Sequence, residues 1–158
     1  MLKGTIAVLI ILSTVSICHS SPVKGDRAPD FRGITSAGTA LSLAGYAGEV
    51  VILDFFATWC ASCRELTPFL ADLAKKYKVK IIGMDVDDSG EEKINAYIRK
   101  NGISFPVVYA DDKVQSLYGI RSVPVVYIIG KDGIIAGKFQ GFNRDIAASL
   151  ESLIKRIQ

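Results

Sequence analysis

The chain has 158 residues, of which 49% are hydrophobic and 22% are charged, and its formal net charge is +3. This length suits one domain with a sizeable core, and the composition is that of a folded rather than a disordered chain. The positive charge is small and forms no run of lysine and arginine, so we predict no nucleic-acid partner.

The first twenty residues have the pattern of an export signal. Lys3 supplies a positive flank, and residues 4–18 then carry no charge and are rich in Ile, Val and Leu. This stretch has the length of a signal h-region and is shorter than the roughly 20 residues that span a bilayer comfortably. We predict residues 1–20 as a signal peptide cleaved after Ser20, with a retained N-terminal membrane anchor as the alternative. Either leader predicts an exported protein.

Export changes the interpretation of the cysteines. Removal of the leader takes away Cys18 and the only histidine, His19, and leaves Cys60 and Cys63. An exported protein with one C-x-x-C pair and no spare cysteine is better suited to using that pair than to being stapled by it. A zinc site would need about four ligands, which the mature chain does not offer, so we predict no metal.

The elements after the leader alternate between buried strands and amphipathic helices. Polar residues 21–30 are predicted as a linker, residues 31–158 as the domain, and glycine-rich residues 33–48 as loops and short strands. Continuous apolar runs predict strands over residues 49–56, 79–86, 105–109, 125–129 and 134–139. Helical periodicity predicts helices after Cys60 through Tyr77 and over residues 91–100, 114–118 and 145–157.

The order of these elements predicts the fold class. Strands and helices alternate first, and a hairpin with the turn signal Lys131-Asp132-Gly133 comes late. Such an order is typical of an α/β fold with a mixed central sheet and helices on both faces.

Cys60 and Cys63 stand where a buried strand ends and a helix begins. Disulfide exchange needs a thiolate, whereas an ordinary cysteine has a pKa near 8.5. The unpaired N–H groups and partial positive charge of a helix N-terminus favour the thiolate. We therefore predict that Cys60 caps the helix and is the attacking sulfur. Cys63, one turn in and less exposed, would resolve the mixed disulfide.

Asp54 lies six positions before Cys60, inside a run that otherwise looks buried. Burial of an unpaired carboxylate raises its pKa. Such a group near the cysteine pair could accept the proton of Cys63 when that sulfur must attack. The alternative is that the strand pattern ends early and Asp54 is half exposed.

Val123 and Pro124 come just before a buried strand. A cis bond at this proline could bring the Val123 backbone beside the cysteines, where it would hold a substrate segment as an added strand. A trans proline at the strand start is the alternative. Together with Trp59, which directly precedes the first cysteine, these residues are our predicted substrate-binding positions.

Two segments in their order along the chain, residues 54–63 and 118–124, resemble the thioredoxin superfamily. Residues 25–31 and 91–109 resemble its exported TlpA/ResA-like branch, which adds an N-terminal extension and a helix–strand insertion to the thioredoxin core. The resemblance covers residues 25–158. It implies a thioredoxin fold and an exported thiol–disulfide oxidoreductase, in the periplasm or at the outer face of the cytoplasmic membrane.

The resemblance also assigns roles. In the family the first cysteine is the nucleophile, the second resolves and the proline is cis, and these roles fall on Cys60, Cys63 and Pro124. The buried aspartate of classical thioredoxins falls on Asp54. The branch mostly contains reductases of exported protein disulfides, fed by a thiol electron donor in the membrane. We expect a monomer with no dissociable cofactor, because electrons pass through the Cys60–Cys63 disulfide itself.

Departures from the family pattern bear on the alternatives. Leu66 stands where members that act in cytochrome c maturation carry a glutamate, and Gly83 stands where thioredoxins carry a lysine beside the buried aspartate. A thiol peroxidase on the same fold would place threonine and proline where this chain has Ala57 and Leu53. A non-catalytic metal-binding module of the related type would need a distant histidine, which the mature chain lacks.

Overall fold

The computed structural model describes residues 21–87 and 90–158, so the predicted signal peptide or anchor at residues 1–20 lies outside the described residues. The strands are β1 (Arg32–Ile34), β2 (Ala40–Ser42), β3 (Val51–Phe56), β4 (Lys80–Asp85), β5 (Val107–Tyr109), β6 (Val125–Ile129) and β7 (Ile135–Gln140). The helices are α1 (Ala61–Tyr77), α2 (Glu91–Lys100), α3 (Asp112–Tyr118) and α4 (Arg144–Ile157), with a short 3-10 helix at Leu43–Tyr46.

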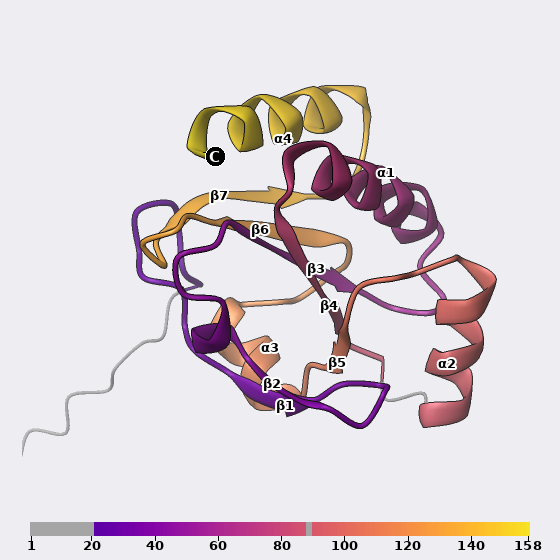
Figure 1. Cartoon of the computed structure of the whole chain (residues 1–158). Coiled ribbons are helices and arrows are strands. Elements are labelled where there is room, and N and C mark those ends of the chain that lie inside the picture. The colour runs from indigo at the N-terminus through magenta and orange to yellow at the C-terminus, as the bar shows by residue number, and fades with distance from the viewer. Residues whose placement is uncertain (1–20, 88–89) are drawn as a thin grey trace, which may run out of the picture.

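The core is a five-stranded mixed sheet in the order β5-β4-β3-β6-β7 (Figure 1). Strands β3, β4 and β5 run parallel, whereas β6 lies antiparallel to β3 and β7 antiparallel to β6. The parallel pairs are joined by the helices α1 and α2, and the last two strands form a hairpin. The predicted mixed sheet is therefore confirmed.

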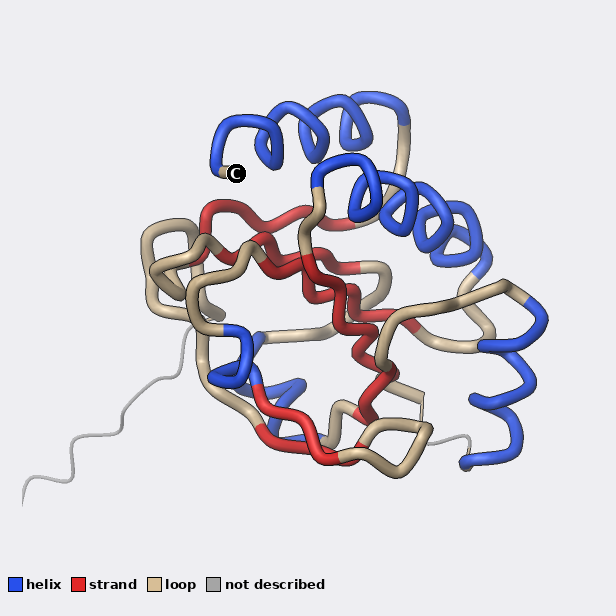
Figure 2. Tube along the Cα trace, in the orientation of Figure 1, coloured by secondary structure: helices blue, strands red, loops and turns tan. Residues whose placement is uncertain are grey.

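All six residues of β3 are buried, so this central strand has helices or loops over both of its faces. Alternate side chains point to opposite faces. Val51, Leu53 and Phe55 join a core that includes residues of α3 and of the N-terminal segment. Ile52 joins the core formed with α1 and α4, and Figure 2 shows these two helices together over one side of the sheet. Helices on both faces are thus also confirmed.

Several element boundaries differ from the predictions by one or two residues, and two of these differences have a clear local reason. Strand β5 begins at Val107, two residues later than predicted, since Pro106 has no N–H to donate to a ladder. Helix α3 begins at Asp112, two residues earlier, because Asp111 caps it: its side chain accepts a hydrogen bond from the Val114 amide at 2.8 Å. Each of the two boundaries thus follows from one residue, Pro106 for β5 and Asp111 for α3.

The segment 21–30, predicted as a linker, packs on the hairpin of β6 and β7. The Gly25 amide donates to the Ile135 carbonyl at 2.9 Å, and the Ile135 amide donates to Asp26 at 2.9 Å. Ala28 is buried in the core. The folded unit therefore extends back to Ser21 and does not begin at Phe31. In the described ranges, none of the helices combines the length and the apolar character needed to cross a membrane.

Candidate active site

Cys60 and Cys63 form a disulfide at the N-terminus of α1, with 5.3 Å between their Cα atoms. Cys60 is the N-cap residue, and its sulfur accepts a hydrogen bond from the Cys63 amide at 3.1 Å. Cys60 is 4% exposed and Cys63 is fully buried. The pair therefore has the geometry that the sequence predicts, with the first sulfur at the helix end and the second beneath it.

Trp59 marks the surface next to the disulfide. Its side chain is 67% exposed, which is unusual for a large apolar residue beside a buried pair. On the other side of Cys60, the hydroxyl of Ser62 lies 3.6 Å from the Cys60 sulfur. An exposed aromatic ring and a partly buried hydroxyl thus lie next to the first cysteine.

Asp54 lies in the middle of β3 and is fully buried, so the half-exposed alternative is excluded. One carboxylate oxygen accepts a hydrogen bond from the hydroxyl of Thr67 at 3.1 Å. Burial raises the pKa of Asp54 from 3.8 to about 7, and the Thr67 hydrogen bond opposes this rise. Thr67 lies four residues after Cys63 on α1, about one helical turn away, so Asp54 lies beneath the first turns of the redox helix.

Gly83 is directly paired with Asp54 in the β3–β4 register. A Cβ atom at Gly83 would lie 3.0 Å from a methyl of Val107, 3.1 Å from Phe105 and 3.2 Å from Phe56. These contacts leave no room for a longer side chain. Strand β4 therefore offers Asp54 no polar partner at this position, in line with the departure seen in the sequence.

The Val123–Pro124 peptide bond is cis, as the resemblance implies, so the trans alternative is not the one observed. The Pro124 carbonyl accepts a hydrogen bond from the Gly141 amide at 2.9 Å, which ties the start of β6 to the end of β7. Val123 is partly buried against the apolar cluster that contains both cysteines. The structure thus brings Cys60, Cys63 and Val123 to one region.

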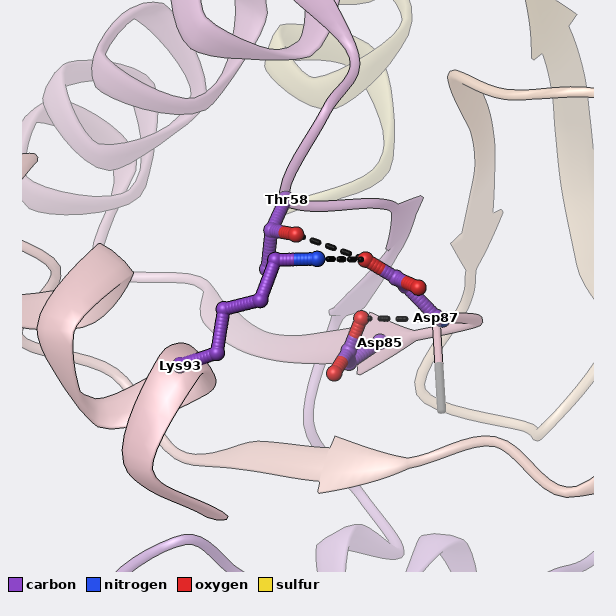
Figure 3. Close-up of polar contacts among 4 residues, drawn as sticks. All are labelled: Thr58, Asp85, Asp87 and Lys93. Carbon is purple, nitrogen blue, oxygen red and sulfur yellow. Dashed lines mark hydrogen bonds and ion pairs between the residues drawn. The ribbon is translucent and has the colours of Figure 1, made fainter. Parts of the chain in front are cut away.

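Four residues whose contacts the sequence analysis missed lie at the turn before the cysteines (Figure 3). The Thr58 hydroxyl donates to a carboxylate oxygen of Asp87 at 2.6 Å, and the Lys93 ammonium donates to the same oxygen at 3.2 Å. The Asp87 amide donates to the Asp85 carboxylate at 3.1 Å. The Thr58 hydrogen bond is the main reason that the pKa of Asp87 lies below its usual value. The only sequence signal was the position of Thr58, two residues before Cys60.

Side chains able to hold a cofactor or metal were also sought. Among residues 21–87 and 90–158, no group of three or more His, Cys, Asp or Glu side chains is placed to hold a metal ion. A pocket of about 320 Å³ lies beside Asp87, with Ile94 and Val107 among its apolar lining residues and Asp85 and Glu91 among its acidic ones. Its lining residues do not include either cysteine.

Comparisons with known proteins show which family the sequence matches. Residues 24–138 match the AhpC/TSA family. Thioredoxin-like protein YneN of Bacillus subtilis (strain 168) is 31% identical over 71% of this chain and 68% of its own length. Thiol-disulfide oxidoreductase ResA of Bacillus thuringiensis (strain Al Hakam) is 30% identical over 84% of this chain and 78% of its own.

A solved structure shows the same fold. A Chlorobium tepidum protein, assigned provisionally as thiol:disulfide interchange protein DsbE, superposes with a TM-score of 0.79 and 29% identity. The match covers 87% of this chain and 99% of that one. The two proteins therefore share a fold, and the predicted thioredoxin fold is confirmed.

Proposed function

The chain belongs to the AhpC/TSA family and is a thiol–disulfide oxidoreductase of the thioredoxin fold, and we propose that it reduces or exchanges disulfides of exported proteins through Cys60 and Cys63. The observation that carries this proposal is the Cys60–Cys63 disulfide at the N-terminus of α1, beside the exposed Trp59.

The proposed cycle starts from the reduced pair. The Cys60 thiolate attacks a substrate disulfide, so a Cys60–substrate bond forms and one substrate thiolate leaves. The Cys63 thiolate then attacks the Cys60 sulfur, closes the Cys60–Cys63 disulfide and releases the second substrate thiolate. Two electrons pass to the substrate, and a thiol donor must return two to the pair. In exchange or oxidation the same steps run backwards.

The helix N-terminus supports the role of Cys60 as nucleophile. In the disulfide form the Cys63 amide already donates to the Cys60 sulfur, and the same donor would stabilise a thiolate there. Asp54 is proposed to accept the proton of Cys63 before the second attack. Its position beneath α1 and its pKa of about 7 support that role at neutral pH.

Substrate binding is proposed for Trp59, Val123 and Pro124. The exposed ring of Trp59 offers apolar area beside Cys60. Val123 packs on the cluster that holds both cysteines, so its backbone is suited to pairing with an extended substrate segment. A substrate strand held there would present its disulfide to the first cysteine.

Location and partners are proposals from the leader and the resemblance. The leader at residues 1–20 supports export to the periplasm or to the outer face of the cytoplasmic membrane, either free or through a retained anchor. We propose a thiol electron donor in the membrane, a monomeric protein and no dissociable cofactor. A role in cytochrome c maturation gains no support from Leu66, which is fully buried.

The reduction potential of the Cys60–Cys63 pair tests the direction. Equilibration of the purified protein in defined thiol buffers should give a value below roughly −220 mV for a reductase, and a value above roughly −150 mV would overturn that direction. A Cys63→Ser variant should accumulate the Cys60–substrate mixed disulfide, and Cys60→Ser should not. Turnover of hydrogen peroxide by the wild-type protein would instead favour the peroxidase.

A further inference from the structure

Two buried polar atoms near the redox helix have no hydrogen-bond partner. Among the described side chains, they are one carboxylate oxygen (Oδ1) of Asp54 and the hydroxyl of Tyr97. Buried groups of this kind are rare because each loses its hydration without compensation. Asp54 comes from the central strand β3, and Tyr97 comes from the insertion helix α2. Their coincidence calls for a physical explanation.

The two groups face the same space. Asp54 and Phe56 point to the same side of β3, since they are two residues apart on a strand. The Tyr97 ring stacks on Phe56, with 5.4 Å between ring centroids and 17° between planes. Tyr97 also belongs to the apolar cluster that contains Cys63. Burial and then the negative charge of Asp54 raise the pKa of Tyr97, which agrees with this proximity.

Neither of the two strands next to β3 supplies a hydrogen-bond partner for Oδ1 of Asp54. On β4 the residue opposite Asp54 is Gly83, where a Cβ would already lie 3.0 Å from Val107. On β6 the residue opposite is Val126, which is apolar. Thr67 on α1 donates to the other carboxylate oxygen, and it also lies close enough to Tyr97 to lower the pKa of that hydroxyl. The hydroxyl of Tyr97 is therefore the polar group available to Oδ1 from the insertion helix.

We propose that Tyr97 is a positioning residue for Asp54, and that its hydroxyl, together with Thr67, controls when the Asp54 carboxyl takes up the proton of Cys63. This inference rests on the proposed function. A tyrosine hydroxyl both donates and accepts. The two atoms are not hydrogen-bonded to each other in the structure, so the proposed bond forms during the cycle: the hydroxyl would donate to Oδ1 when Asp54 is ionised and accept from the carboxyl O–H when Asp54 is protonated. Either state of the acid is thus satisfied without a lysine.

The proton balance is simple. In the resolving step the Cys63 S–H bond breaks, an O–H bond forms on Asp54, and the resulting thiolate attacks the Cys60 sulfur. A donor to the carboxylate favours its charged form. Loss of the Tyr97 hydroxyl should therefore raise the pKa of Asp54 above about 7 and leave less carboxylate at neutral pH to receive the proton.

Other charged groups face this space and share its titration. Arg64 on α1 and Asp85 on β4 both act on Tyr97, the first lowering and the second raising its pKa. Neither is changed in the variants below, so their effects are common to all of them. Cys63 titrates in the reduced state only, and the test therefore follows the step in which it loses its proton.

The experiment follows the resolving step in the Tyr97→Phe variant, which keeps the ring and removes the hydroxyl. Reduced protein is mixed with 5,5′-dithiobis(2-nitrobenzoate), and release of the second thionitrobenzoate, which reports attack by Cys63, is recorded by stopped flow between pH 5 and pH 10. We expect the pH midpoint to rise by about one unit, and the rate at pH 7 to fall about fivefold. Carboxyl ¹³C NMR should show the same rise for Asp54.

Four further substitutions keep the test decisive. Tyr118→Phe removes a buried hydroxyl on the opposite face of the sheet, where it donates to the Pro29 carbonyl, and should leave the midpoint unchanged. Thr67→Val should raise the midpoint as Tyr97→Phe does, and Thr67→Ser should restore it, so the idea is testable even if Tyr97→Phe folds poorly. In an Asp54→Asn background, Tyr97→Phe should have no further effect.

Two failures can be told apart. Profiles of Tyr97→Phe and wild type that coincide, or an effect of Tyr97→Phe that persists without Asp54, would overturn this inference while the oxidoreductase activity stands. Absence of disulfide exchange by the wild-type protein at every pH would instead overturn the proposed function on which the inference rests.

Discussion

Two aspartates near the redox motif have opposite surroundings. Asp54 is fully buried under α1, and loss of hydration raises its pKa to about 7. Asp87 lies near the surface, where the Thr58 hydroxyl and the Lys93 ammonium meet on one of its oxygens and lower its pKa. Surroundings rather than residue type therefore make one carboxyl a candidate proton acceptor and the other a permanently charged anchor.

The difference gives the two groups opposite effects on stability as pH changes. The folded protein holds the Asp54 proton up to about pH 7, whereas an unfolded aspartate loses it near 3.8. The stability that this proton confers is present at low pH and is lost as pH rises from about 4 to 7. The hydrogen bonds of Asp87 act the other way: their contribution is present above pH 3.8 and is lost as pH falls through the lowered pKa.

The largest expected effect comes from Asp54→Asn, which removes the buried charge. The rise of this pKa from 3.8 to about 7 corresponds to a cost on the order of 4 kcal/mol at alkaline pH. The oxidised variant should exceed wild type in the free energy of unfolding by up to that amount at pH 8, with the gain vanishing near pH 4. Urea denaturation across pH 4–9 measures it, and Asp72→Asn on the exposed side of α1 is the matched control. Equal pH slopes in wild type and Asp54→Asn would contradict the assignment.

The sequence reveals features that depend on residues close together in the chain, but not contacts between residues far apart in it. The burial of Asp54 and the cap formed by Cys60 are local consequences of a strand followed by a helix, and both were predicted. The partners of Asp87 were not, because Thr58 and Asp87 are 29 residues apart and meet only when β3 and β4 pair. Tyr97 was missed for the same reason, since its helix is amphipathic whether or not its hydroxyl has a role.

The N-terminal segment shows the same limit. Its composition, polar with two prolines, is typical of a linker. Its attachment depends on backbone bonds such as Gly25 to Ile135, which no side-chain pattern encodes. The resemblance to the TlpA/ResA-like branch was the better guide here, because it included residues 25–31 in the folded part. A polar composition with prolines therefore predicts a flexible linker only where no backbone from a distant part of the chain is free to pair with the segment.

A smaller effect is expected from Thr58→Val, which tests Asp87 as an anchor of the turn before Cys60. Loss of the 2.6 Å hydrogen bond should lower the free energy of unfolding by about 1–2 kcal/mol at pH 7. Because the bond is strong only while Asp87 is ionised, the loss should shrink below pH 3.8. Thr58→Ser keeps the hydroxyl and should behave as wild type. A loss of the same size at every pH would assign the effect to packing of the Thr58 methyl instead.

The smallest effect is expected from Lys93→Gln, and it separates the two contacts of Asp87. The Lys93 side chain is 56% exposed, so its ion pair should contribute less than about 0.5 kcal/mol at low salt. At 1 M salt the Debye length is about 3 Å, so an exposed ion pair of this kind is largely screened. The difference in the free energy of unfolding between Lys93→Gln and wild type should therefore disappear at that salt concentration. Lys100→Gln, on the same exposed helix surface, is the control for a lost charge.

The cost of Thr58→Val should survive the same salt, since a short hydrogen bond at a partly buried oxygen is screened much less. If instead both variants lose their effect in 1 M salt, the anchor of the active-site turn is electrostatic throughout, and Asp87 acts by its charge. If only Lys93→Gln is salt-sensitive, the Thr58 hydroxyl holds the turn at 1 M salt without help from the Lys93 charge. The insertion helix would then help to hold the turn through Lys93 only at low salt, where the ion pair is not screened.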